Sequence, residues 1–284
     1  MENKGLLGAL FTKYKTMNKP AILYKYEPFS VQSLKNLKAQ CIYYGSPLNF
    51  NDPYDCALKA SILKPTSHEL EKIRKKYLAR EDLPLQVAAS IKSLPAGDLL
   101  SFFLRVAETA LLDHGEKFIS SRGVTCFSEV NNDLLMWSRY GGVYRGFCLG
   151  FDTTYVPFDK IRKVIYTKKM PKISLATLLL SDDSTEIVNL FCTKSKSWEY
   201  EKEWRGIHEN SGTKFTYDAA ALKSIYFGPD MDFESFEIIA LILAGQNSNV
   251  ELWEGKRSMD KFEVLFKKVN YTNFVNAKRN GLLP

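Results

Sequence analysis

Residues 123–152 read GVTCFSEVNNDLLMWSRYGGVYRGFCLGFD, and the rest of the chain is organised around them. Residues 123–128 form a β-branched and aromatic run, which is typical of a strand. Residues 145–151 alternate like a second strand, and the polar segment between the two favours a short helix that ends at a Gly-Gly pair. The sequence therefore predicts a strand, a short helix and a second strand.

Polar and amphipathic side chains crowd this central unit, where a buried core would otherwise be expected. They are Ser128, Glu129, Trp137, Ser138 and Tyr140. Such a density of hydrogen-bonding groups beside two strands predicts a functional site, because buried polar groups need partners or a role.

Composition limits the class of protein. The chain has 284 residues, 45% of them hydrophobic and 13% aromatic, which permits a sizeable core and suits an antiparallel or mixed sheet. Its net charge of +7 favours phosphate-rich partners or substrates, although a solvated basic surface is the stronger explanation of the charge. We expect an N-terminal amphipathic helix within residues 1–20 and a single α+β domain over residues 21–284.

Cysteine and histidine usage argues against metal and disulfide chemistry. The five cysteines include no C-x-x-C pair, and the three histidines show no metal-ligand spacing. Free thiols in a reducing cytoplasm are expected, with no metal site. No signal peptide or run of about 18 apolar residues is present, so no membrane association is expected. Glycine-rich nucleotide motifs are also missing, which leaves hydride transfer and nucleotide triphosphate hydrolysis without support.

The flanking segments predict the remaining elements. Residues 64–120 have helical periodicity and begin with a capping box at Thr66, so they predict a helical insertion. Strands are expected at 22–26, 41–45, 161–166, 223–227, 250–253 and 262–269, and helices at 30–37, 171–190 and 233–244, the second with an interruption around 181–184 as an alternative.

The loop SPLNFNDPYD at residues 46–55 has two interpretations. Asn51, Asp52 and Asp55 are expected either to line a cleft or to form an Asx-type turn before the insertion. Polar loops beside a core are more often structural than functional, so the turn is the stronger alternative.

A second informative stretch is WEYEKEWR at residues 198–205. As a strand, it would place Glu199, Glu201, Glu203 and Arg205 on one face, where three neighbouring carboxylates need a cation or a ligand hydroxyl for compensation. As a helix, it would pair Glu201 with Arg205 on the surface. The two tryptophans favour the strand.

Five separated motifs resemble the bacterial family called domain of unknown function 2971. The motifs are Leu23-Tyr24-Lys25-Tyr26, Phe50-Asn51-Asp52-Pro53-Tyr54-Asp55, Cys126-Phe127-Ser128-Glu129, Met136-Trp137-Ser138 with Tyr140 and Gly146-Phe147, and Lys194 with Trp198, Glu201, Glu203, Trp204 and Arg205. The resemblance carries little agreed biochemistry.

The order of these motifs is also similar to the middle of the ADP-ribosyltransferase fold. That resemblance implies a split, twisted, mixed or antiparallel sheet and NAD as the substrate. It assigns catalysis to Glu203, Glu201 and Ser128. NAD contacts would fall on Lys25, Tyr26, Trp137, Ser138, Tyr140 and Arg205, although Lys25 stands where the superfamily usually has Arg or His.

Cleavage of the nicotinamide–ribose bond fits these residue types. A carboxylate stabilises the positive charge that develops on the ribose, and an aromatic ring holds the planar leaving group. The expectation is ADP-ribosyl transfer or NAD hydrolysis, with a nucleic-acid or protein acceptor. Family resemblance suggests a toxin or phage-defence effector with a neutralising partner. A magnesium-dependent nuclease using Asp52, Asp55, Glu201 and Glu203, and a binding module without catalysis, remain open alternatives.

Overall fold

The chain forms two compact units, each discontinuous in sequence. The computed structural model describes residues 19–56, 60–181, 185–247, 249–272, 277, 279 and 281, so the helix expected within residues 1–20 lies outside the described residues apart from Lys19 and Pro20. The first unit contains Ser46–Arg122 and Ile165–Lys196, and the second contains the remaining described residues. The residues expected to form one domain are thus shared between the two units.

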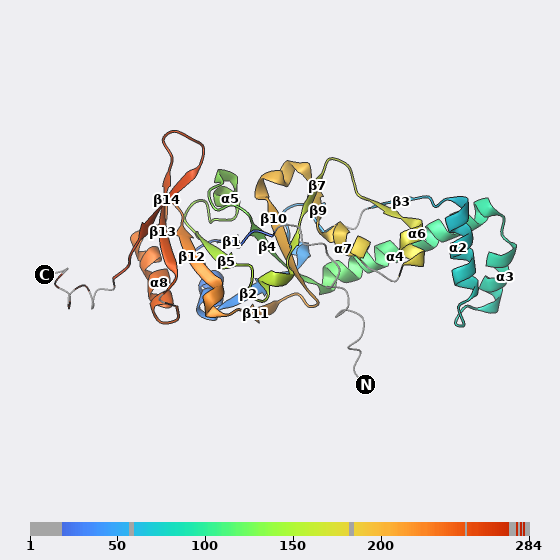
Figure 1. The fold of residues 1–284 in the computed structure, drawn as a ribbon, viewed down its shortest axis with the longest axis horizontal. Coiled ribbons are helices and arrows are strands. Elements are labelled where there is room, and N and C mark those ends of the chain that lie inside the picture. The colour runs from blue at the N-terminus through green and yellow to red at the C-terminus, as the bar shows by residue number, and fades with distance from the viewer. Residues whose placement is uncertain are drawn as a thin grey trace. The chain divides into compact units, whose positions relative to one another are not determined.

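The second unit is built on an eight-stranded sheet with the order β14-β13-β12-β5-β1-β4-β10-β6 (Figure 1). Only β12 and β13 pair in parallel among these strands, so the sheet is mixed, and its edge strands leave it open. This confirms the expected α+β class with a mixed sheet. The strands are β1 (Ile22–Glu27), β4 (Gly123–Ser128), β5 (Phe147–Asp152), β6 (Arg162–Lys163), β10 (Glu203–His208), β12 (Leu222–Phe227), β13 (Glu251–Arg257) and β14 (Val264–Val269).

Helices cover both faces of this sheet. One face packs against α1 (Val31–Lys38) and α8 (Phe233–Ala244) through a core that includes Leu37, Ile239, Phe151 and Phe227. The other face packs against α5 (Leu134–Arg139) through Met136 and Trp137. A two-stranded ribbon of β2 (Cys41–Tyr44) and β11 (Thr213–Thr216) adds Ile42 and Tyr44 to the first core. The 3-10 turns η3 (Phe158–Lys160), η4 (Lys196–Glu201) and η5 (Ala219–Ala221) connect these elements.

Local sequence explains where these helices begin. Ser30, Asp133 and Asp232 each accept a hydrogen bond from a backbone N–H of the first turn of α1, α5 and α8, as N-cap residues do. The predicted strand–helix–strand motif is therefore present as β4, α5 and β5. Its two strands are not neighbours, because β1 lies between them and pairs with both.

The first unit is mainly helical. The predicted insertion at 64–120 contains α2 (Ser67–Leu78), α3 (Leu85–Ser93) and α4 (Ala96–Ser121), and Thr66 and Glu69 form the predicted capping box. These helices share a core with α6 (Leu175–Leu180), centred on Ile73, Phe103 and Leu175. The other elements are η2 (Pro47–Asn49), α7 (Thr185–Phe191), the parallel pair β3 (Ser61–Leu63) and β8 (Lys172–Ser174), and the parallel pair β7 (Ile165–Thr167) and β9 (Thr193–Ser195).

Two predicted elements were wrong in extent. Residues 161–166 form two strands instead of one, because the Val164 N–H bonds to Glu203 in the second unit while the Ile165 N–H bonds to Cys192 in the first. The helix expected at 171–190 begins with strand β8, which pairs with β3. Among the described helices, none combines the length and the apolar character that crossing a bilayer requires.

Candidate functional site

A row of five residues crosses the sheet of the second unit on the face that α5 covers. Strand register pairs Glu203 with Ser128, Ser128 with Tyr24, Tyr24 with Gly150, and Gly150 with Ser224. Directly paired residues on neighbouring strands point to the same face. We call these five residues the polar row. Ser128, Glu203 and Ser224 are buried, so the row is a polar layer inside the unit.

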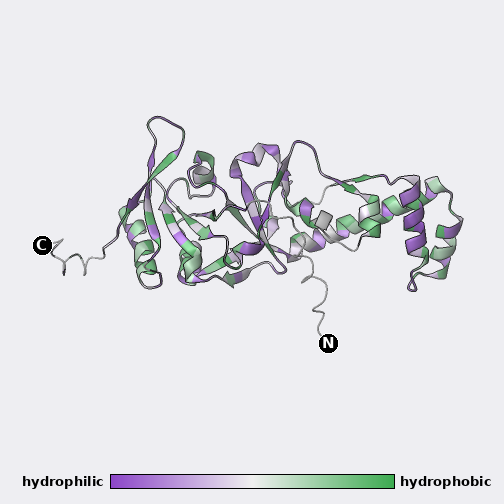
Figure 2. Ribbon diagram, viewed as in Figure 1, coloured by the Kyte–Doolittle hydropathy of each residue, from purple (hydrophilic) through white to green (hydrophobic). Residues whose placement is uncertain are grey.

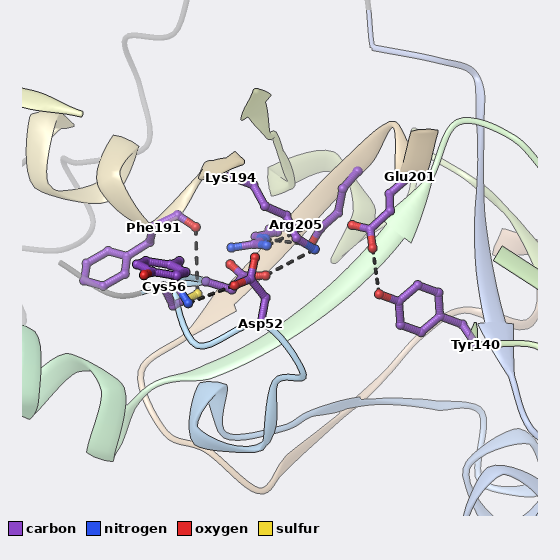
Figure 3. Close-up of polar contacts among 10 residues, drawn as sticks. Asp52, Cys56, Tyr140, Phe191, Lys194, Glu201 and Arg205 are labelled. Atoms are coloured by element: carbon purple, nitrogen blue, oxygen red, sulfur yellow. Dashed lines mark hydrogen bonds and ion pairs between the residues drawn. The ribbon is translucent and has the colours of Figure 1, made fainter. Parts of the chain in front are cut away.

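Glu201 joins the middle of the chain to its later part. Its carboxylate Oε1 accepts a hydrogen bond of 2.6 Å from the hydroxyl of Tyr140, at the C-cap of α5 (Figure 3). Its backbone carbonyl accepts a bond of 2.7 Å from Ser128 Oγ. The side chain of Glu201 is buried, while Tyr140 is half-buried. The structure therefore brings three of the predicted residues, Ser128, Tyr140 and Glu201, into direct contact.

The segment that carries Glu201 differs from its prediction. Residues 198–201 belong to η4 rather than to a strand, and Lys202 has a φ of +44° that turns the chain into β10 at Glu203. The expected alternation of Glu199, Glu201, Glu203 and Arg205 along one strand face was therefore wrong before residue 203. A 3-10 turn followed by a left-handed residue breaks the two-residue period on which that expectation depended.

Glu203 is held in a buried ion pair with Arg205. The Arg205 guanidinium donates from Nε to Oε1 at 2.6 Å and from Nη2 to Oε2 at 3.0 Å, and the Arg205 side chain is fully buried. The two residues are two apart on β10 and share the face of the polar row. Such a paired geometry fixes the orientation of the carboxylate and offsets its charge.

Trp137 and Tyr26 hold the connection between β4 and α5. Trp137 is fully buried, donates from Nε1 to the Asn131 carbonyl at 2.7 Å and meets the ring edge of Tyr26 at 5.1 Å between centroids. The Tyr26 hydroxyl donates to the Val130 carbonyl, and burial raises its pKa well above the ordinary value, so it remains a donor. Both side chains are engaged in packing. Ser138 lies beside them on α5 and is half-buried.

Lys25 points to the opposite face of β1 from Tyr24 and Tyr26. Its ammonium lies 3.4 Å from Glu27 and 5.7 Å from the centroid of the Phe127 ring, which belongs to the core beneath α1 and α8. Successive side chains of a strand point to opposite faces. Because Tyr24 lies in the polar row, the next residue, Lys25, points to the other face of the sheet. The structure does not bring Lys25 together with the polar row.

The predicted cleft residues belong to the first unit. Asp52 Oδ1 accepts the Tyr54 N–H at 2.9 Å, which is the Asx-type turn of the structural interpretation. Asp55 forms a buried ion pair of 3.2 Å with Lys194, and Asn51 is exposed. Within the described part of the chain, no cluster of three or more His, Cys, Asp or Glu side chains could hold a metal ion.

Sequence reasoning missed three side-chain interactions made by Arg139 and Glu129. The exposed Arg139 guanidinium stacks over the Trp198 ring at 4.9 Å, one residue before Tyr140. Glu129 accepts hydrogen bonds from Lys163 and Trp204. Burial acts to raise the Glu129 pKa, but these two hydrogen bonds outweigh it and hold the pKa below its ordinary value. Each partner lies far away in sequence, so no local pattern could reveal the pairs.

Two aromatic rings, Tyr226 on β12 and Trp253 on β13, form a group with Tyr24 of the polar row. Tyr24 meets Tyr226 edge-on at 5.7 Å, and Tyr226 stacks on Trp253 at 5.9 Å. Burial, with the neighbouring Tyr226, raises the pKa of Tyr24, so its phenol stays neutral. A buried carboxylate with hydroxyl donors and partly buried aromatic rings can stabilise a developing positive charge and hold a planar group.

Comparison with known proteins supports a family relationship for part of the chain. A family model described as "Protein of unknown function (DUF2971)" matches residues 136–206, which include Trp137, Tyr140, Glu201, Glu203 and Arg205. No curated protein and no solved structure matches the chain. The matched segment begins in α5 and ends in β10, so it includes both partners of the Tyr140–Glu201 hydrogen bond.

Proposed function

We propose that this protein cleaves the bond between nicotinamide and ribose in NAD and passes ADP-ribose to water or to a macromolecular acceptor. The observation that carries the proposal is the contact of Tyr140 and Ser128 with Glu201: the Tyr140 hydroxyl bonds the Glu201 carboxylate, and the Ser128 hydroxyl bonds the Glu201 backbone carbonyl. An arrangement similar to the ADP-ribosyltransferase fold is part of this proposal.

In the proposed reaction, the C1′–N bond breaks and its electron pair leaves with nicotinamide. The ribose then carries positive charge, and the Glu201 carboxylate stabilises that charge. An oxygen of water or of the acceptor forms the new bond to C1′, and its proton passes to solvent. The products of hydrolysis are nicotinamide, ADP-ribose and one proton, so atoms and charge balance.

We place Glu201 rather than Glu203 against the substrate. Both oxygens of Glu203 accept hydrogen bonds from Arg205, and Glu201 accepts a hydrogen bond from Tyr140, whose half-buried ring could contact a bound nicotinamide. The resemblance assigned the catalytic role to Glu203. In this proposal the Glu203–Arg205 pair instead supports β10 beneath Glu201, and Ser128 fixes the Glu201 backbone.

The chain also offers groups for the rest of NAD. The partly buried rings of Tyr24 and Tyr140 suit the planar nicotinamide, and Arg139 is an exposed cation beside Tyr140 that suits a pyrophosphate. We propose a bacterial toxin or phage-defence effector acting in the cytoplasm, with a neutralising partner and a protein or nucleic-acid acceptor, as the natural setting of this activity.

Release of nicotinamide from NAD by the purified full-length protein tests the proposal. Glu201→Gln keeps the size of the side chain but removes the charge, so we expect nicotinamide release to fall at least about 100-fold. Glu199→Gln makes the same change at an exposed position of the same turn and is expected to remain active. Thermal melting should confirm that both variants are folded. A wild-type protein that releases no nicotinamide, or an active Glu201→Gln variant, would contradict the proposal.

A further inference from the structure

Helix α8 carries an apolar stripe on its exposed side. Glu234, Ile238, Leu241 and the C-cap residue Gly245 are among the exposed residues of this segment, and their spacing of four, three and four residues places them on one continuous face of the helix. Ile238 is 44% exposed and Leu241 is 49% exposed. We call these four residues the α8 seam.

The opposite side of α8 already supplies the core. Ile239 and Leu243 pack into the sheet, so a helix that only covered this sheet would be expected to have polar residues on its outer side. Instead, residues 238–244 read IIALILA without a polar residue, and Figure 2 colours most of α8 as hydrophobic. A spacing of three and four with apolar side chains at its centre is the pattern by which helices pair with one another.

Charges flank the α8 seam with opposite signs at its two ends. Glu234 stands in the first turn, after the N-cap Asp232. At the other end, the Gln246 side chain donates to the backbone carbonyl of Lys38, so the C-terminal end of α1 adjoins the C-terminal end of α8. Lys35 and Lys38 are both exposed there, and the described residues include no ion-pair partner for either.

We propose that the α8 seam pairs with the same seam of a second copy of this chain, in an antiparallel arrangement around a two-fold axis. An axis midway between Ile238 and Leu241 sets the apolar side chains of the two copies against each other. It also places Glu234 of one copy opposite Gly245 of the other, next to Gln246 and Lys38. The surface is therefore self-complementary in both hydrophobicity and charge, as a two-fold interface must be.

Sedimentation velocity of the full-length chain, over about a hundredfold range of concentration, measures this association. We expect a reversible dimer in the wild type. Leu241→Glu should raise the dimer dissociation constant at least about tenfold, because it places a charge in the centre of the interface. Leu112→Glu is the matched control, since Leu112 is also an exposed leucine on a helix, in the first unit. It should leave the dimer unchanged.

Charge reversal tests the antiparallel orientation. Lys38→Glu and Glu234→Lys should each weaken the dimer, because each opposes like charges across the interface, and the double variant should recover most of the loss. Circular dichroism should show that all variants are folded. A wild type that stays monomeric, a Leu241→Glu variant that dimerises normally, or a double variant weaker than both single variants would overturn the proposal.

Discussion

Two buried carboxylates, Glu201 at the end of η4 and Glu203 at the start of β10, lie in different environments. Glu201 accepts a hydrogen bond from a neutral hydroxyl, whereas Glu203 is locked to a fully buried guanidinium. A buried cation whose partner is removed keeps its desolvation cost and loses its compensation. Substitution by glutamine should therefore change the stability of the protein to different extents at the two positions.

For Glu203→Gln, we expect the free energy of unfolding to fall by about 3–5 kcal/mol, because the substitution removes the carboxylate charge that faces the fully buried Arg205 guanidinium across two hydrogen bonds. Urea denaturation followed by tryptophan fluorescence measures this change. The catalytic role that resemblance gave to Glu203 predicts instead a nearly unchanged stability with lost turnover.

The control for Glu203→Gln is a glutamate in an exposed ion pair, Glu251. Glu251→Gln breaks the surface pair with Lys268, and exposed pairs contribute little to stability. Its denaturation midpoint should stay close to that of the wild type. Equal effects at positions 203 and 251 would contradict the structural role of the Glu203–Arg205 pair.

The connection from α5 to β5 makes a left-handed turn. Gly142, Val143 and Tyr144 have φ values of +57°, +54° and +66°. Backbone hydrogen bonds hold the turn, from Tyr144 to the Trp137 carbonyl and from Gly146 to the Gly141 carbonyl. A β-branched residue in this region is strained, and the strain lies three residues after Tyr140.

Val143→Asn should raise the free energy of unfolding by about 1 kcal/mol, because asparagine tolerates the left-handed region far better than valine. Val143 is 66% exposed, so the exchange loses little burial. Thermal or urea denaturation of the variant and the wild type measures this difference in the free energy of unfolding.

Gly142→Ala is the opposing variant in the same turn. A Cβ at position 142 would sit 3.2 Å from Pro28 Cα at a positive φ, so it should destabilise the protein. If Val143→Asn were also destabilising, backbone strain would not be the property that distinguishes this turn.

Between β4 and the edge strand β6, the pair Glu129–Lys163 gives stability that depends on pH. The Glu129 pKa is lowered below its ordinary value of about 4.3, so the contribution is complete above that value and disappears as pH falls through the lowered pKa. Lys163→Met should lower the melting temperature at neutral pH. This difference should shrink as pH falls through the lowered Glu129 pKa, leaving only the contact of Lys163 with the Trp204 ring.

Lys160→Met serves as the control, because Lys160 is an exposed lysine just before β6. Its melting temperature should follow the wild type at every pH. A Lys163→Met difference that is constant from neutral to acidic pH would exclude the assigned electrostatic origin.

At the scale of the whole molecule, local patterns predicted elements better than their assembly. The caps at Ser30 and Thr66 and the extent of α8 follow from neighbouring residues, and these were predicted correctly. The site drawn from resemblance grouped Tyr140 with Glu201, but the hydrogen bond between their side chains was not predicted. The face of the sheet to which the Lys25 side chain points depends on strand register, and no local sequence pattern determines that register.

The helical insertion was expected from its periodicity, but the point at which the chain passes between the two units was not. Residues 161–166 have the composition of one strand, yet the chain passes from the second unit to the first between Val164 and Ile165. The partners that separate β6 from β7 are Glu203 and Cys192, both about 30 residues or more away. Non-local pairing of this kind leaves no periodic signal in the sequence.

The two units have separate cores, and their spectroscopic signals are separable too. All four tryptophans of the chain, at positions 137, 198, 204 and 253, belong to the second unit, whereas α2, α3 and α4 belong to the first. Phe103→Ala removes a fully buried ring from the first unit and should cost about 3–5 kcal/mol. We expect the helical circular dichroism transition to move to lower temperature while the tryptophan fluorescence transition moves much less. Equal shifts of both probes would show that the two cores unfold as one cooperative unit.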